Sequence, residues 1–380
     1  NLKGIKGANS SGCNIVCCNN PSDLSYGKEQ SYVSSVSEKV MKKYTQAFNV
    51  LTESRRNKTT LGDMTLLFWA ETSQKPLDYA DFFSVTSGLM YIDKEAEITQ
   101  NVKTCIEMLD NGKMPDINEI GLDADTKFYL LGLTSNNSRE AIKLFYENSF
   151  GKILENVQDH IENILVKEGQ KVPSVYSIAR ELVSPNGSEK IPNASLVSGL
   201  LNSMITRSMY PQNLLSQVLL RIKTDQDDSD KKNIYIKIND TRVGIIKAYL
   251  NRKNKINNKG EMITMALNEK NLEKPYLCGR LFAVLEKLQK DAIGDVNSNI
   301  KSRYFSSACV TPAMVFPRLI KLAQNHINKL ENSGYLESKI SEIINLMGDN
   351  FPSTLSIEDQ GKFVIGYYQQ NKNLYTKKGE

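Results

Sequence analysis

The sequence predicts an α+β protein that is predominantly helical, with a mixed α/β N-terminal part followed by a C-terminal bundle of the four-helix type. Strand-like apolar runs occur only before residue 150, whereas after Pro173 the apolar residues recur at helical spacing. The chain has 380 residues, and single hydrophobic cores stop growing near about 250, so we expect more than one domain. The changes in pattern place the domains at residues 1–125, 126–260 and 261–380.

The N-terminal part alternates between strand and helix signals. CNIVCC (13–18) and MTLLFWA (64–70) have the composition of strands, and the stretch 37–56 between them has helical spacing at Val40, Tyr44 and Leu51. Residues 76–115 are mostly helical and polar, and they end in the turn-rich DNGKMPD. We interpret them as a helical connection.

The middle part begins with two apolar runs, FYLLGLTS (128–135) and REAIKLFYE (139–147), on either side of a polar NNS turn. A helix follows from Phe150, with Ile153, Val157, Ile161 and Ile164 on one face. Two strands and a helix in this order predict a small α+β unit. The stretches 195–205, 213–222 and 241–250 are then helical in pattern.

From Tyr276 onward the whole pattern is helical. YLCGRLFAVLEKLQKDA (276–292) predicts an amphipathic helix with Arg280 at a polar position. Thr311 before Pro312 is a good N-cap, and Pro317 indicates a kink or a late helix start. SKISEIINLM (338–347) is helical, and Ser356 with Asp359 resembles a capping box that opens the last helix. Four such helices with short links make a bundle.

Composition excludes several classes of protein. Hydrophobic residues make up 40% and charged residues 24% of the chain, and no run approaches the roughly 18 apolar residues of a membrane span. The six cysteines form no CxxC pair and only two histidines occur, so we predict no metal site. Scattered cysteines of this kind favour a location in the reducing interior of the cell. The chain starts at Asn1 without a signal or transit peptide, and we interpret it as truncated or cleaved.

Positive charge is concentrated in one segment of the chain. The formal net charge is +5, but residues 231–260 alone hold nine Lys or Arg against one acid, Asp240, directly after the acidic DQDDSD (225–230). Such a run is usually a solvated loop or helix face, and the alternative is an anion-binding surface, because basic clusters attract phosphate. The sequence leaves both open.

RYFSSACVTP (303–312) resembles a nucleophile loop, with serines and a cysteine before a helix start. A nucleophile needs a base within hydrogen-bond reach, and His326 would lie some 20 Å from Cys309 along a straight helix that rises about 1.5 Å per residue. We therefore interpret the stretch as a tight packing site and keep a thiol or serine hydrolase centred on it as the alternative function. No nucleotide-binding or metalloprotease motif is present, so we predict no catalytic residue, metal ligand or cofactor.

Several strings, in order along almost the whole chain, together resemble one family. They are GANSSGCNIVCCN, SYGKEQ, GDMTLLFWAE, FYLLGLTSNNSREAIKLFYENSFG, GRLFAVLEKLQ, NIKSRYFSSACVTPAMVFPRLIKLAQNHINKL and QGKFVIGYYQQ. The family is the Csd family, the large subunit of the type I-C CRISPR interference complex (Cascade), here without its N-terminal region. The resemblance implies a noncatalytic bacterial or archaeal cytoplasmic subunit. Such a subunit helps to recognise the protospacer-adjacent motif, binds target and displaced DNA strands and recruits the helicase–nuclease.

The partners that the resemblance implies are crRNA, target double-stranded DNA, the displaced single strand, the helicase–nuclease and the other Cascade subunits (backbone, crRNA-processing and small), with no membrane. It also implies a small subunit made by internal initiation, for which Met262 and Met265 are possible starts. Our candidates for nucleic-acid contact are basic side chains: Lys28, Arg55, Arg56, Lys58, Lys247, Arg252, Lys253, Arg280, Arg303, Arg318 and Lys321. Asn9 and Ser10, in the Gly-rich GANSSG turn, are candidates for contact near the protospacer-adjacent motif.

Overall fold

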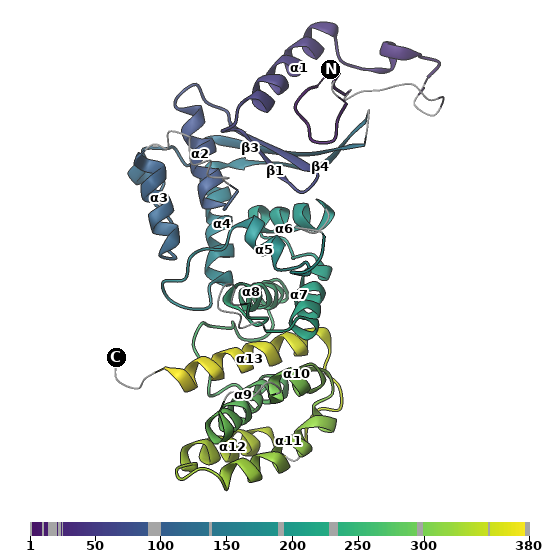
Figure 1. Cartoon of the computed structure of the whole chain (residues 1–380). Helices are drawn as coiled ribbons and strands as arrows, with labels where there is room; N and C mark the ends of the chain where they lie inside the picture. Colours follow the sequence, from purple (N-terminus) through teal and green to yellow (C-terminus); the bar gives the residue numbers. More distant parts are fainter. Residues whose placement is uncertain are drawn as a thin grey trace. The chain divides into compact units, whose positions relative to one another are not determined.

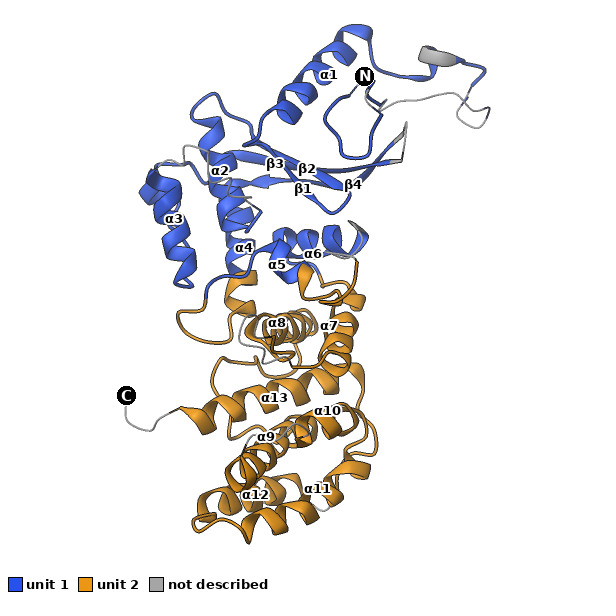
Figure 2. Ribbon diagram, in the orientation of Figure 1, with its two compact units in different colours: residues 1–159, 171–179, 191–208 blue, residues 160–170, 180–190, 209–380 orange. Residues whose placement is uncertain are grey.

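The computed structural model describes residues 2–9, 11–13, 21, 24, 26–89, 100–136, 139–188, 194–227, 235–294, 299–348 and 350–376 (Figure 1). They form two compact units, shown in blue and orange in Figure 2. The first comprises residues 1–159, 171–179 and 191–208, and the second comprises residues 160–170, 180–190 and 209–380. The division at residues 125 and 260 that the sequence suggests stays a prediction.

The first unit is built on an antiparallel sheet in the order β1-β2-β3-β4. Its strands are β1 (Lys58–Leu61), β2 (Met64–Ala70), β3 (Lys127–Asn136) and β4 (Arg139–Ser149). β2 confirms the strand expected at 64–70, and β3 and β4 confirm the expected hairpin. A bulge between Gly132 and Leu133 shifts the β3–β4 register.

Each face of this sheet has its own core. On one face, Phe68 and Phe128 pack with Phe83 and Phe150 from the helices, with ring centroids 5.0–5.3 Å apart. On the other face, Leu67 and Leu133 join a cluster with Leu2, Ile5, Cys13 and Phe48. This alternation follows from the period of two along a strand, because neighbouring residues point to opposite faces.

The remaining elements of the first unit are helical. They are η2 (Gln30–Val33), α1 (Glu38–Glu53), α2 (Pro76–Thr86), α3 (Gln100–Asp110), η3 (Asn118–Ile120), most of α4 (Phe150–Ile164), α5 (Val175–Arg180) and α6 (Ala194–Thr206). Ser37 caps α1 by accepting a hydrogen bond from the backbone N–H of Val40. These helices confirm the expectations at 37–56, 76–115, 150–168 and 195–205. The strand expected at CNIVCC lies outside the described residues apart from Cys13, which forms an isolated bridge with Leu2.

The second unit consists of helices in its described part. They are α7 (Gln212–Thr224), α8 (Asp240–Asn257), α9 (Lys274–Ile293), α10 (Ile300–Val310), α11 (Pro312–Ile327), α12 (Gly334–Met347) and α13 (Ile357–Tyr375). α13 packs along α9 and also against α7 and α8 (Figure 1). Phe282 of α9 contacts Phe305, Phe316, Phe363 and Tyr367, so the bundle has an aromatic centre. The predominantly helical α+β fold class is thus confirmed.

Four local details bear on the expectations from the sequence. The stretch 303–309 is itself helical, because α10 runs from Ile300 to Val310. Thr311 occupies the N-cap position of α11 but makes no side-chain cap; its hydroxyl instead donates to the carbonyl of Ser307. α11 starts at Pro312 and continues through Pro317, so there is no late start. The N-cap half of the capping box is confirmed, because the backbone N–H of Asp359 donates to the hydroxyl of Ser356, and this hydroxyl in turn donates to the carboxylate of Asp359.

Candidate nucleic-acid interface

Within the basic segment 231–260, α8 is buried from Arg242 to Arg252, whereas Lys255 and Lys259 near its end are exposed. Lys231 and Lys232 lie outside the described residues, and the next cations, Lys237, Arg242, Lys247 and Arg252, are all buried. Lysine and arginine are almost never buried unless they are paired. Each must therefore have internal partners, and the structure shows them.

Lys247 caps the C-terminal end of α4. Its Nζ donates to the carbonyl oxygens of Glu162, Asn163 and Leu165 at 3.1, 3.0 and 2.9 Å. The first two carbonyls belong to the last turn of the helix and the third to the residue that follows it, where the helix supplies no backbone N–H for them and where a cation is favourable. Burial lowers the pKa of Lys247 to about 8. Gly244 permits the close approach, because a Cβ at this position would lie 2.1 Å from the carbonyl oxygen of Ile164.

The two arginines of α8 also have structural roles. Arg242 donates to Glu181 at 2.7 Å and to Asp225 at 2.9 Å. The guanidinium of Arg252 lies 4.8 Å from the centre of the Tyr210 ring. The expectation that Lys247 and Arg252 contact nucleic acid does not fit this structure, because both side chains are buried and hold helices together.

Two further candidates are engaged in the same way. Arg280 is 0% exposed; it donates to the side chain of Gln370 at 3.0 Å and lies 3.5 Å from Glu342. The amphipathic pattern of 276–292 placed Arg280 at a polar position, but the packing of α13 against α9 covers it. Lys253 is half-buried and forms an ion pair with Glu358 of α13. These contacts stabilise the second unit, so they do not support phosphate binding by either side chain.

The N-terminal candidates differ in their exposure to solvent. Arg56 donates to Asp81 at 2.9 Å, and the Nζ of Lys58 donates to the carbonyl of Thr52. Lys28 and Arg55 are exposed. A phosphate in solution can therefore reach these last two side chains more readily than Arg56 or Lys58, which are partly buried.

Asn9 is exposed in a loop closed by two backbone hydrogen bonds between Leu2 and Cys13, of 2.8 and 3.0 Å. Its carbonyl accepts the backbone N–H of Gly12 at 2.9 Å, so a turn presents the side chain. Ser10 lies outside the described residues. The loop is held to the sheet, since the backbone N–H of Lys6 donates to the hydroxyl of Thr65.

The α10–α11 hairpin brings the other candidates together. Residues 299–330 contain no Asp or Glu, and they contain five Lys or Arg: Lys301, Arg303, Arg318, Lys321 and Lys329. Lys301 is bound to Asp227 at 2.7 Å, while the other four are exposed. This hairpin is therefore a cationic surface with no acid of its own to neutralise it.

Helical spacing orders the exposed residues of α11 into one stripe. They are Met314, Pro317, Arg318, Lys321, Gln324, Asn325 and Asn328, three or four positions apart or adjacent. α10 adds the exposed Ser302, Arg303 and Ser307. The guanidinium of Arg318 lies 5.4 Å from the centre of the Tyr304 ring, so the two helices contact each other through these side chains. Most of this surface consists of cations and neutral hydrogen-bond donors, the groups that bind phosphate oxygens.

The family model of the CRISPR-associated protein Csd1 (Cas_Csd1) matches residues 1–375. The chain belongs to the Csd1 family. The match spans nearly the whole sequence and confirms the resemblance that the ordered motifs indicated, so the chain is a subunit of a CRISPR complex. A search of curated proteins found no match.

For this Csd1 family member, the RYFSSAC stretch does not support a hydrolase. Cys309 is fully buried, its Sγ lies 3.8 Å from the carbonyl of Gln360, and burial raises its pKa to about 12. The hydroxyl of Ser306 donates to the carbonyl of Lys223 at 2.8 Å. A buried, protonated thiol is a poor nucleophile, so the stretch is the packing site that we expected.

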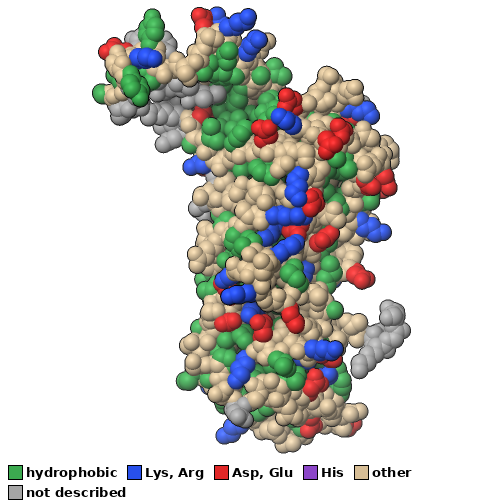
Figure 3. Space-filling model, turned by 180° about the vertical axis from the view of Figure 1, so that it is seen from behind, with side chains coloured by type: hydrophobic (Ala, Val, Ile, Leu, Met, Phe, Trp, Pro, Cys, Tyr) green, Lys and Arg blue, Asp and Glu red, His purple; other side chains and the backbone are tan. Residues whose placement is uncertain are grey.

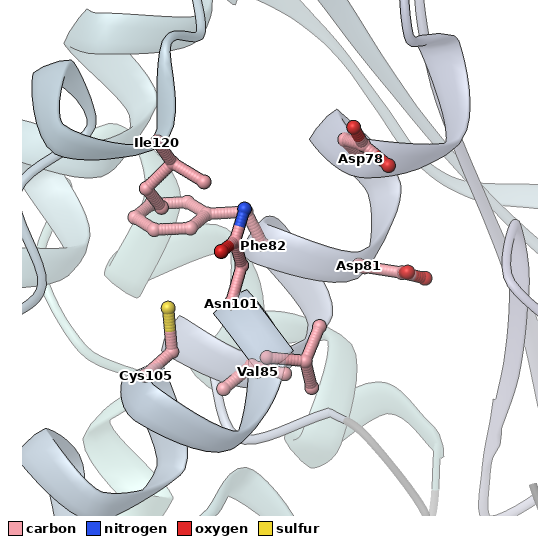
Figure 4. Close-up of a pocket in the computed structure, with 8 residues that line it drawn as sticks. Asp78, Asp81, Phe82, Val85, Asn101, Cys105 and Ile120 are labelled. Carbon is pink, nitrogen blue, oxygen red and sulfur yellow. The ribbon is translucent and has the colours of Figure 1, made fainter. Parts of the chain in front are cut away.

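The first unit contains a small pocket lined by residues of α2, α3 and η3 (Figure 4). Its volume is about 90 Å³, and Phe82, Val85 and Cys105 contribute apolar groups to its lining. The carboxylates of Asp78 and Asp81 at its rim are bound by Arg56. Ligand pockets usually measure about 300–1,000 Å³, so this pocket does not suit a nucleotide.

The described residues offer neither a metal site nor a membrane-spanning helix. No group of three or more His, Cys, Asp or Glu side chains there could hold a metal ion. No helix in the same ranges is long and apolar enough to cross a membrane.

Sequence reasoning missed part of this interface. Arg303, Arg318 and Lys321 were candidates, but Lys329 and the neutral donors Gln324 and Asn325 were not. The available signal was the absence of acid over the 32 residues 299–330, which a count of cations alone overlooks.

Proposed function

We propose that this protein is a noncatalytic large subunit of a crRNA-guided type I-C surveillance complex, and that the α10–α11 hairpin binds the phosphate backbone of target or displaced DNA. The observation that carries the proposal is the exposed, acid-free face of this hairpin. Membership in a CRISPR-associated family supplies the context. In such complexes base pairing with the guide reads the sequence, so a protein surface without base-reading groups is sufficient.

The further roles that we propose follow from the family resemblance. The loop with Asn9 and Ser10 assists recognition of the protospacer-adjacent motif, and exposed Lys28 and Arg55 add backbone contacts. The complex acts in the bacterial or archaeal cytoplasm with crRNA and the other Cascade subunits, and it recruits the helicase–nuclease. The buried Cys309 supports the noncatalytic part of the proposal.

The test is the salt dependence of DNA binding by the purified complex. The triple variant R303E/R318E/K321E should bind more weakly, and the slope of log K against log salt should fall by about 0.7 to 0.9 per lost phosphate contact. The control is K75E/K103E/K113E, which reverses three exposed lysines of the first unit. Unchanged affinity and slope in the first variant would remove the hairpin from the interface.

A further inference from the structure

Large apolar side chains are exposed in an unusual concentration near the N-terminus. Among the described residues, 23 large hydrophobic side chains are exposed, and seven of them lie between residues 24 and 50: Leu24, Tyr26, Tyr32, Val36, Val40, Met41 and Val50. An even distribution would place about two there, and single exposed apolar residues need no explanation, whereas a contiguous group marks an interaction site. Figure 3 shows green side chains together with blue ones over the segment with η2 and α1, at the upper left.

α1 presents part of this group on one face. Val40, Lys43, Ala47 and Val50 follow one another at intervals of three or four residues, and all four are exposed. The other side of the helix is anchored, because Phe48 and Leu51 pack into the core on the sheet. Since the anchored side fixes the helix, the exposed face is held in place, and none of the described residues covers it.

The charge on this face indicates what it binds. Lys39 lies beside Val40, so the face carries Lys39 and Lys43. Glu38 points to another side of the helix, where it pairs with Lys42 at 2.6 Å. A partner that covers the face must therefore bring carboxylates to the two lysines and apolar groups to the two valines.

We propose that the exposed face of α1, formed by Lys39, Val40, Lys43, Ala47 and Val50, docks onto a protein partner in the CRISPR complex whose surface offers an apolar groove edged by acidic residues. Nucleic acid also supplies negative charge, but aliphatic side chains neither stack on bases nor bond to phosphates, so burying Val40 and Val50 against it gains little. A protein groove with an acidic edge can contact both the valines and the lysines of this face. The inference rests on the family assignment and is independent of DNA binding by the α10–α11 hairpin.

The experiment measures how much of this chain is retained in the complex. The complex is purified from cells that express all its subunits and crRNA, through a tag on a different subunit, and the stoichiometry of this chain is read by native mass spectrometry. V40Q/V50Q removes the apolar part and K39E/K43E reverses the charge, and each should lower retention about tenfold or more, as expected for a central contact. I256Q, an exposed isoleucine at the end of α8, is the matched control and should be retained.

The altered side chains are exposed, so the thermal unfolding of the isolated variants should match the unaltered chain. Full retention of both variants would overturn the proposal. So would a self-associating chain whose dimer is lost in V40Q/V50Q, because the occupant would then be a second copy. Loss of DNA binding by isolated V40Q/V50Q would also overturn it, in favour of nucleic acid. The two proposals can fail separately. Full retention of the α1 variants refutes this inference, whereas unchanged DNA binding by R303E/R318E/K321E refutes the proposed function.

Discussion

Replacing Lys247 by Met should destabilise the protein, and the size of the effect should depend on pH. The substitution removes three hydrogen bonds from an ammonium group and leaves the carbonyls of Glu162, Asn163 and Leu165 buried without their donor. An unsatisfied buried acceptor costs about 1–3 kcal/mol, which gives several kcal/mol for three. Against this, the variant no longer buries a charge, and a pKa lowered from 10.5 to about 8 corresponds to about 3 kcal/mol.

The pH dependence follows from the direction of the pKa shift. Between pH 8 and 10.5 the unfolded chain holds the proton on Lys247 and the folded chain has released it, so the stability of the unaltered protein rises with pH. From pH 7 to 9.5 this gain is about 2 kcal/mol relative to K247M, in which no group titrates at this position. Groups that titrate in both proteins contribute equally to both stabilities, so they cancel when K247M is compared with the unaltered protein.

Urea denaturation followed by far-ultraviolet circular dichroism measures both quantities. K253M, which removes a half-exposed ion pair from the same helix, is the control and should cost no more than about 1 kcal/mol. A K247M protein whose deficit stays constant from pH 7 to 9.5 would show that Lys247 is not buried as a cation, and the reasoning would fail.

Three further predictions concern the second unit. Replacing Gly279 by Ala should lower the free energy of unfolding by about 1–3 kcal/mol or more, because a Cβ there would lie 2.0 Å from the carbonyl oxygen of Phe363 and would force α9 and α13 apart. The control G334A, where a Cβ meets no neighbour within 4 Å, should unfold like the unaltered protein. Cys309 is buried, so C309S should leave interference intact, and lost interference with normal folding would contradict an inert role. Residues 262–380 expressed alone should unfold cooperatively on heating, although Gln360 and Tyr368 lose Lys223 and Asp240 as partners, and a gradual loss of ellipticity would disprove autonomy. Replacing the Met262 and Met265 codons by leucine codons should remove the band of the separate small subunit from a gel of the purified complex.

Local patterns predicted the elements well because their causes are local. β2, the β3–β4 hairpin and α8 follow from periodicity and turn residues that lie within each segment. α10 was harder to predict, because two serines and small residues interrupt its apolar spacing, and packing against α11, α9, α13 and α7 stabilises its helix.

The candidate site could be predicted only in part, because burial depends on partners far away in the sequence. Nothing within 231–260 indicates that Arg242 meets Glu181 or that Lys247 meets the end of α4. A count of charges cannot separate a cation that holds helices together from one that faces water. In the hairpin 299–330 the count was informative, because that segment contains no acid at all.

The position of α13 constrains the order in which the protein can fold during synthesis. Residues Gln360–Gln370 lie at the centre of the second unit, where they pack on α9, α7 and α8, yet they are translated after all of these helices. While the ribosome still encloses them, α9 exposes the surface around Gly279, and Arg280 lacks Gln370. The first unit can be completed on the nascent chain, but the second must wait until α13 has left the ribosome. A transcript that stops before Ile357 yields helices without the one that packs between them.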